Sequence, residues 1–89
     1  MVFSNKKIFK NKNGEIHVGL SAPEGFSAGS INDVKKALKN LGEMKLWRCH
    51  VCNDLHIGTM PPETCPTCFA VDAFVEINEN EIKNLLEVR

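Results

Sequence analysis

The sequence predicts a small α+β fold in which two cysteine-bearing hairpins take the place of a large apolar core. The chain has only 89 residues, and its four cysteines form two Cys-x-x-Cys pairs. Its apolar residues repeat every second residue in some segments and every third or fourth in others, which indicates both strands and helices. A chain this short buries only about 60% of its unfolded surface, so a metal, a disulfide or a partner subunit usually adds stability.

A β-hairpin is expected at residues 6–20. Asn13 and Gly14 form an Asn-Gly pair, the strongest short turn signal, between a short strand and the alternating residues 15–20. Residues 21–29 contain one proline and two glycines, so we expect a loop there.

Two helices are expected, each with a recognisable start. Ser30 is suited to cap the first, and Asp33 stands where its carboxylate reaches back to the Ser30 amide. Gly42 is suited to end this helix in a left-handed conformation. Asn78 and Glu81 repeat the capping pattern for a helix that follows an expected strand at 73–77. The apolar stripe of the first helix consists of Ile31, Val34, Leu38 and Leu41.

The cysteine pairs predict one metal site. Cys49 and Cys52 are separated from Cys65 and Cys68 by twelve residues, and two such turns facing each other complete a tetrahedron of sulfur. Four thiolates suit zinc or iron. The alternatives are disulfides or a thioredoxin-like redox pair, but such a pair needs one motif beside a βαβ unit, and none surrounds these pairs.

The residues around the cysteines closely resemble the short rubredoxin-like domain at the end of rubrerythrins, over about residues 46–77. The similarity implies a rubredoxin-like or zinc-ribbon-like pair of metal-bound hairpins. It also implies one iron that cycles between its ferrous and ferric forms, with the four cysteines as ligands. The residues that carry the resemblance are Trp47–Cys52, His56–Thr59, Pro61–Cys68 and Ala73–Phe74.

Several side chains are expected beside this metal. The resemblance implies that Trp47, Ile57 and Phe74 are core residues next to it. The apolar rim over the sulfurs, where a redox partner would dock, is expected to consist of Val51, Leu55, Pro66 and Phe69. His50 and His56 are expected at the surface or close to the site, and His17 is interpreted as an ordinary strand residue.

The chain departs from the family pattern after the second cysteine of each pair. Where the family often has glycine, this chain has Asn53 and Phe69. Glycine suits these positions because the backbone there tends towards positive φ. Asparagine tolerates that geometry, whereas phenylalanine pays about 1 kcal/mol or more. We therefore expect the second loop to be distorted, or Phe69 to be held by packing.

Three parts are expected along the chain: an N-terminal hairpin and helix at 1–45, the rubredoxin-like domain at 46–77 and a C-terminal helix at 78–89. Residues 1–45 do not resemble the four-helix di-iron domain of rubrerythrins, because they are too short and lack its Glu-x-x-His pairs. Peroxidase activity is therefore not implied. The two amphipathic helices offer a possible route to a homo-oligomer.

Charge and hydropathy favour a cytoplasmic protein without nucleic-acid or membrane partners. Eleven basic residues balance eleven acidic ones, whereas phosphate binding needs clustered excess Lys and Arg. Nothing approaches the 18 or more apolar residues of a membrane span, and no secretory signal is recognisable. A reducing cytosol also disfavours disulfides.

The function expected is that of an electron carrier, or of an accessory subunit that serves an oxidoreductase partner. No nucleophile–base pair, phosphate loop or convergent carboxylate pair appears, so we expect no catalytic residues and no enzyme activity of its own. The expected cofactor is one iron ion (2+/3+), with Zn²⁺ as the alternative or as a replacement on overexpression. The rival hypothesis is a zinc-ribbon-like protein-interaction module whose ion is purely structural.

Overall fold

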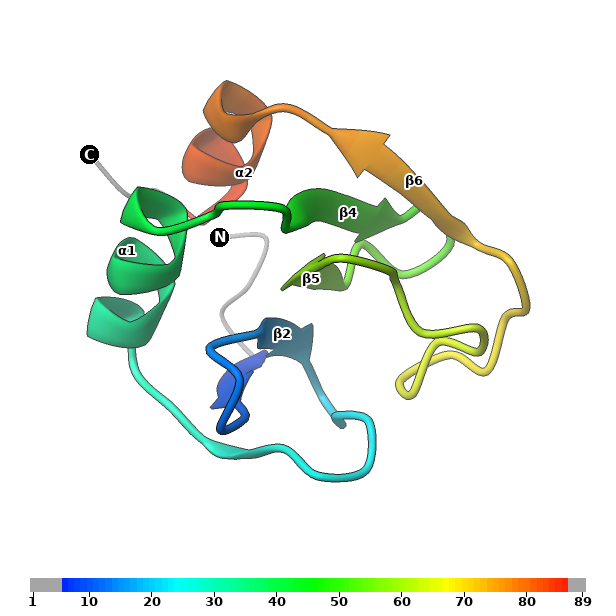
Figure 1. The fold of residues 1–89 in the computed structure, drawn as a ribbon. Coiled ribbons are helices and arrows are strands. Elements are labelled where there is room, and N and C mark those ends of the chain that lie inside the picture. The colour runs from blue at the N-terminus through cyan, green and yellow to red at the C-terminus, as the bar shows by residue number, and fades with distance from the viewer. Residues whose placement is uncertain (1–5, 87–89) are drawn as a thin grey trace.

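The computed structural model describes residues 6–86 and confirms the small α+β fold class. A six-stranded antiparallel sheet carries two helices on one side (Figure 1). The elements are β1 (Lys7–Lys10), β2 (Ile16–Gly19), β3 (Ser27–Ala28), α1 (Ile31–Lys39), β4 (Lys45–Cys49), β5 (Leu55–Gly58), β6 (Phe74–Ile77) and α2 (Glu79–Leu86).

The sheet joins the N-terminal hairpin to the cysteine-bearing strands without a break. Its strand order is β3-β1-β2-β5-β4-β6. The central pairing is between β2 and β5, where His17 lies opposite His56 and Ile16 lies opposite Ile57. The boundary expected between residues 45 and 46 stays a prediction, but main-chain hydrogen bonds cross from one expected part to the other.

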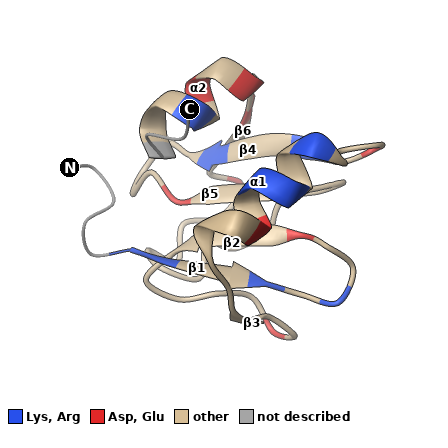
Figure 2. Cartoon of the chain, turned by 90° about the vertical axis from the view of Figure 1, so that its left-hand side faces the viewer, with Lys and Arg blue, Asp and Glu red and all other residues tan. Residues whose placement is uncertain are grey.

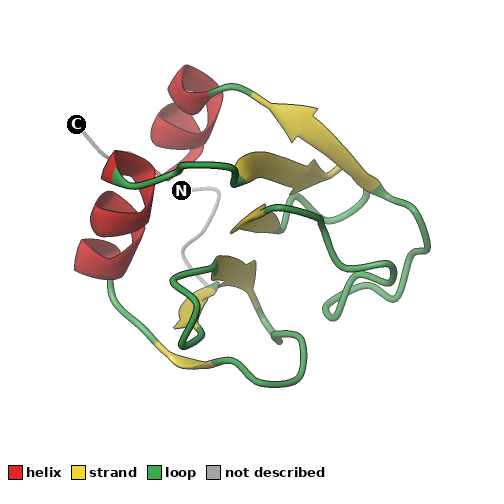
Figure 3. Cartoon of the chain, viewed as in Figure 1, coloured by secondary structure: helices red, strands yellow, loops and turns green. Residues whose placement is uncertain are grey.

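Strand alternation gives the sheet two different faces. Residues paired across antiparallel strands share a face, so the register places Ile16, Ile57 and Leu46 together on one side. The same register places His17 and His56 together on the other side. Figure 3 shows both helices on one side of the strands and the long loops, which carry the cysteine turns, on the other.

The helix-covered face carries the larger apolar core. Ile82 of α2 and Val34 of α1 are both fully buried in it. Each such aliphatic side chain contributes about 1.5–3 kcal/mol when it is fully buried. The stripe of α1 is therefore buried within this chain at Val34 and Leu38, whereas Ile31 at its start is exposed. The buried residues of this core are Ile16, Val18, Val34, Ala37, Leu38, Leu46, Leu55, Ile57 and Ile82.

The helix starts follow the predicted capping pattern. The Ser30 amide donates to Asp33 Oδ2 over 2.8 Å, and the Glu81 amide donates to Asn78 Oδ1 over 2.7 Å. The first helix ends at Lys39, earlier than its apolar stripe indicated. Asn40 ends it by donating from Nδ2 to the Lys36 carbonyl over 2.9 Å. Gly42 does adopt a left-handed φ of 55°, but in the turn after the helix.

The expected loop at 21–29 contains one short edge strand, which sequence patterning missed. In β3, Ser27 pairs with Lys10 and Ala28 with Phe9. Both β3 residues are exposed, so they show no apolar alternation that would indicate a strand. Main-chain pairing with β1 is what makes this segment extended.

Charged residues are spread over both helices, the strands and the loops, as the colours of Figure 2 show. This distribution agrees with the balanced composition of the sequence. Neither helix of the part of the chain that is described, residues 6–86, is long and apolar enough to cross a membrane.

Candidate metal centre

Four cysteine sulfurs converge on the face of the sheet opposite the helices. One Sγ atom from each of Cys49, Cys52, Cys65 and Cys68 lies within 4.8 Å of all the others. The Cys49–Cys68 pair is 3.7 Å apart and the Cys52–Cys65 pair is 3.5 Å apart. A tetrahedron with metal–sulfur bonds of 2.3 Å has edges of about 3.8 Å. The sulfurs are free thiols rather than disulfides, and their spacing fits one metal ion.

The first cysteine turn is closed by two main-chain hydrogen bonds. The Cys49 amide donates to the Asp54 carbonyl over 2.8 Å, and the Asn53 amide returns to the Cys49 carbonyl over 2.8 Å. These bonds reverse the chain sharply between β4 and β5. The reversal brings Cys52 back beside Cys49, as the Cys-x-x-Cys spacing requires.

The second turn repeats the first almost bond for bond. The Cys65 amide donates to the Ala70 carbonyl over 2.9 Å, and the Phe69 amide donates to the Cys65 carbonyl over 2.8 Å. An isolated bridge between Thr64 and Val71 closes its base. Two turns of the same design therefore face each other across the sulfur cluster.

The residue after each second cysteine has a left-handed backbone. The φ angle is 67° at Asn53 and 63° at Phe69. The expectation of a distorted second loop or a packed Phe69 is wrong, because this turn matches the first and Phe69 is 75% exposed. The turn tolerates the strained phenylalanine, since its hydrogen bonds and the sulfur geometry fix the backbone.

Burial makes two of the thiols harder to ionise. It raises the pKa of Cys52 far above its ordinary value and that of Cys65 to about 11. The pKa of Cys68 is lowered, chiefly by the backbone N–H of Ala70. The Cys52 and Cys65 sulfurs also receive backbone N–H groups, from Asp54 in the first case and from the second turn in the other. A bound cation would offset the cost of ionising these clustered thiols.

The side chains expected near the metal differ in how deeply they are buried. Phe74 packs against the buried cluster formed by Cys49, Cys65 and Ala73. Val51 is 59% exposed, so with Phe69 it lies open to solvent. The proline of the second Cys-x-x-Cys, Pro66, is half-buried.

Trp47 shares the face of His56 and Cys49, whereas two aliphatic residues of β5 lie on the opposite face. Trp47 is half-buried, and its Nε1 donates to the Gly58 carbonyl over 3.1 Å. Leu55, expected on the docking rim, is 0% exposed in the helix-side core, as is Ile57 at 1%. Strand alternation explains both corrections, because Leu55 and Ile57 point to the face that His56 does not share.

Sequence reasoning missed a buried polar cluster next to the cysteines. Asp54 and His17 are 0% exposed and His56 is 4% exposed. His17 Nε2 lies 3.2 Å from Asp54 Oδ2, and His17 Nδ1 lies 3.1 Å from His56 Nδ1. The Lys6 ammonium forms an ion pair with Asp54 Oδ1 and donates to the Cys52 carbonyl over 2.9 Å.

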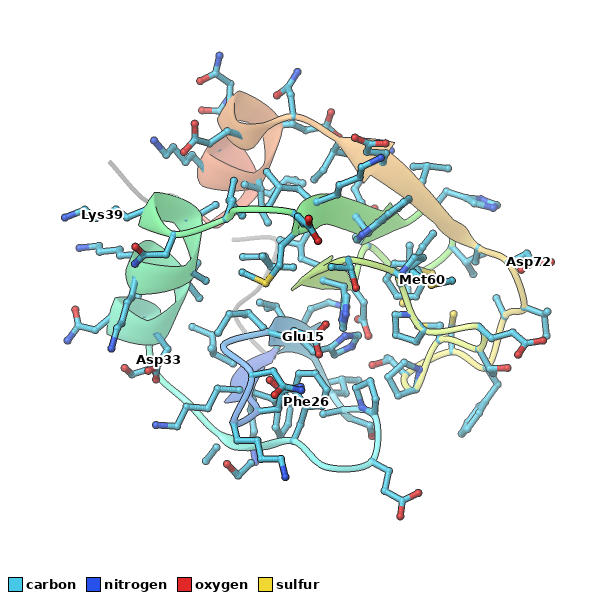
Figure 4. The ribbon with its side chains drawn as sticks, viewed as in Figure 1. Glu15, Phe26, Asp33, Lys39, Met60 and Asp72 are labelled. Carbon is cyan, nitrogen blue, oxygen red and sulfur yellow. The ribbon has the colours of Figure 1, made fainter. Side chains whose placement is uncertain are left out.

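Aromatic rings enclose the two imidazoles. Phe26, labelled in Figure 4, lies with its ring centroid 5.9 Å from that of His56 and 6.5 Å from that of His17. The ring centroid of Phe74 lies 6.2 Å from that of His17. The third histidine, His50, is exposed in the first turn. The pairing of His17 with His56 depends on which strands are neighbours, and no local pattern reveals that.

Substituting Phe69 by glycine tests the strain in the second turn. We expect Phe69→Gly to stabilise the zinc-loaded protein by about 0.5–1 kcal/mol, because glycine removes the left-handed penalty and outweighs its own chain entropy. Phe69→Ala is the matched control: it removes the ring, keeps the strain and is expected to change little. Chemical denaturation measures both, and a glycine variant less stable than the alanine variant would contradict the assignment.

The buried His56 predicts a pH-dependent stability. Burial, with a contribution from His17, lowers its pKa to about 3. The unfolded chain takes up a proton near its ordinary pKa of about 6.5, so the contribution of His56 to stability is complete above that pH and is lost as the pH falls towards 3. Relative to His56→Gln, the free energy of unfolding of wild type should fall by up to about 1.4 kcal/mol per pH unit below pH 6. If the free energies of unfolding of wild type and His56→Gln change in parallel from pH 7.5 to 5.5, this prediction is refuted.

Comparison with known families agrees with the geometry. Residues 47–74 match the family model described as rubrerythrin, rubredoxin-like domain. The matched segment runs from Trp47 in β4 to Phe74 in β6 and contains both turns. Neither a curated protein nor a solved structure matches the chain. The predicted resemblance is confirmed: residues 47–74 are similar to rubredoxin-like domains, and their four cysteines are positioned to hold one metal ion.

Proposed function

We propose that this protein transfers single electrons, as a carrier or as an accessory subunit of a redox enzyme, through one iron held by Cys49, Cys52, Cys65 and Cys68. The observation that carries the proposal is the pair of matched cysteine turns within a segment similar to rubredoxin-like domains. When bound in four thiolates, iron supplies a one-electron change that leaves its tetrahedral surroundings nearly unchanged.

The chain contributes control of the charge at the sulfurs. Four thiolates with ferrous iron give −4 + 2 = −2, and with ferric iron −4 + 3 = −1. Backbone N–H groups that point at Cys52, Cys65 and Cys68 stabilise negative charge on sulfur. They favour the more negative ferrous form and so raise the potential.

The surface around the outer sulfurs supports contact with a redox partner. Cys52 and Cys68 are partly exposed, whereas Cys49 and Cys65 are buried. The exposed Val51 lies between the cysteines of the first turn, and Phe69 follows the last cysteine. An oxidoreductase docked on this apolar rim would approach the exposed pair of sulfurs most closely. The four free thiols suit a reducing compartment, which favours the cytosol.

A structural zinc site is the second candidate. It is favoured by the small hydrophobic cluster on this face, whose buried members among the residues described are Cys49, Cys65 and Ala73. An ion would therefore supply much of the stability that holds the two turns together. Zinc uses the same tetrahedral sulfur donors, and the module would then mediate protein contacts.

Metal analysis of protein from its native source, with an absorption spectrum and voltammetry, separates these candidates. Electron transfer predicts about one iron per chain, a red ferric form that bleaches on reduction and a reversible one-electron wave. The matched control is Cys68→Ser, in which the loss of one thiolate is expected to weaken and shift the ferric charge-transfer bands. Stoichiometric zinc in a colourless protein without a redox wave would overturn the proposal and favour the structural site. Overexpressed protein is unsuitable for this test, because zinc can replace iron there.

A further inference from the structure

A buried carboxylate touches one of the metal-binding sulfurs. Asp54 is 0% exposed, and its Oδ2 lies 3.6 Å from the Sγ of Cys65. This contact has the opposite electrostatic sign to the amide donors on the sulfurs. An amide N–H stabilises negative charge on a thiolate, whereas a carboxylate at this distance destabilises it, and more so where water is excluded.

Two of the side chains that hold Asp54, Lys6 and His17, come from the N-terminal part of the chain. Lys6 binds Oδ1, so the negative end of the ion pair, Oδ2, faces Cys65. His17 in β2 contacts Oδ2 over 3.2 Å. None of these partners lies within the segment similar to rubredoxin-like domains, residues 47–74.

The strand β2 also leaves room for this carboxylate. A Cβ atom placed on Gly19 would lie 2.3 Å from Asp54 Oδ2, so any larger residue there would displace the carboxylate. The Thr67 hydroxyl accepts a hydrogen bond from the Leu20 amide over 3.1 Å. This bond connects the residue after β2 to the second cysteine turn. The N-terminal hairpin is thereby built against the metal-binding turn.

The carboxylate is charged in this setting. The Lys6 ammonium forms an ion pair with Asp54 Oδ1, and His17 Nε2 lies 3.2 Å from Oδ2, so the buried carboxylate has a cation and a hydrogen-bonding ring beside it. At neutral pH a negative charge therefore stands next to Cys65.

We propose that Asp54, positioned by Lys6 and His17, lowers the reduction potential of the iron bound to the four cysteines. The inference rests on the proposed function. Reduction adds one electron from the oxidoreductase partner, takes the site from −1 to −2, and forms or breaks no bond. A fixed negative charge raises the free energy of the −2 state more than that of the −1 state. Asp54 is a positioning and electrostatic residue and binds no metal itself.

The direct test is the reduction potential of iron-loaded Asp54→Asn. Asparagine keeps the size of the side chain and removes its charge, so we expect reduction to become at least tenfold more favourable, which is 59 mV upward for a one-electron couple. Asp72→Asn is the matched control: it makes the same change at an exposed residue near the second turn. Asp72→Asn is expected to change the equilibrium constant for reduction of the iron less than twofold. A shift for Asp54→Asn no larger than the control would overturn the inference and leave the electron-transfer function intact.

Lys6→Gln provides a second variant with the opposite sign. Removal of the cation leaves the carboxylate less compensated, so the potential should fall where Asp54→Asn raises it. A merely structural role for the cluster gives no reason for opposite signs. An unchanged or raised potential in Lys6→Gln would contradict the proposal, and this variant decides the matter where Asp54→Asn does not fold.

Cobalt(II) separates failure of this inference from failure of the proposed function. If iron-loaded wild type shows no redox wave, the function fails, and the cobalt-loaded protein still reports on Asp54. Removal of the nearby charge lowers the energy of the sulfur electrons, so the sulfur-to-metal charge-transfer band of Asp54→Asn should move to higher energy than that of Asp72→Asn. Coincident bands would refute the effect of Asp54 on the sulfurs.

Discussion

The fold depends on the approach of four cysteine sulfurs to within 4.8 Å of one another. Thiolates at this separation repel each other, and burial already raises the pKa of Cys52 and Cys65. A single cation resolves both costs, because it neutralises the repulsion and replaces the lost hydration. A cation would also stabilise the two cysteine turns, because few apolar side chains are buried beside them among the residues described.

Different interactions stabilise the two faces of the sheet. On one face, α1 and α2 bury aliphatic side chains in an ordinary core. On the other, the sulfurs, the charged Asp54 and the two imidazoles are packed under loops with aromatic rings. Because β2 pairs with β5 in the centre of the sheet, the N-terminal hairpin supplies side chains to both faces. The metal centre therefore extends beyond the cysteine motif.

The sequence alone predicts those features that depend on residues close together in the chain. The Ser30–Asp33 and Asn78–Glu81 caps, the N-terminal hairpin and the cysteine spacing each depend on residues close together in the chain. Short-range chemistry determines all of them. The resemblance of residues 46–77 to rubredoxin-like domains could also be recognised from the sequence, because its motif residues lie close to the cysteines in the chain.

The features that were missed depend on long-range register. No local pattern tells which face of the sheet Leu55 occupies; the β4–β5 and β2–β5 pairings place it on the helix-covered face. His17 and Asp54 are 37 positions apart, so their contact required the strand order. The strained Phe69 shows a different limit: residue preference predicted a distorted loop, but the hydrogen-bonded turn overrode that preference.

X-ray absorption on the metal-loaded protein tests the central claim most directly, because it counts the atoms around the ion. The account predicts one metal per chain with four sulfur neighbours at about 2.3 Å and no nitrogen or oxygen neighbour at bonding distance. Fewer than four sulfurs, or imidazole or carboxylate in the inner sphere, would contradict it.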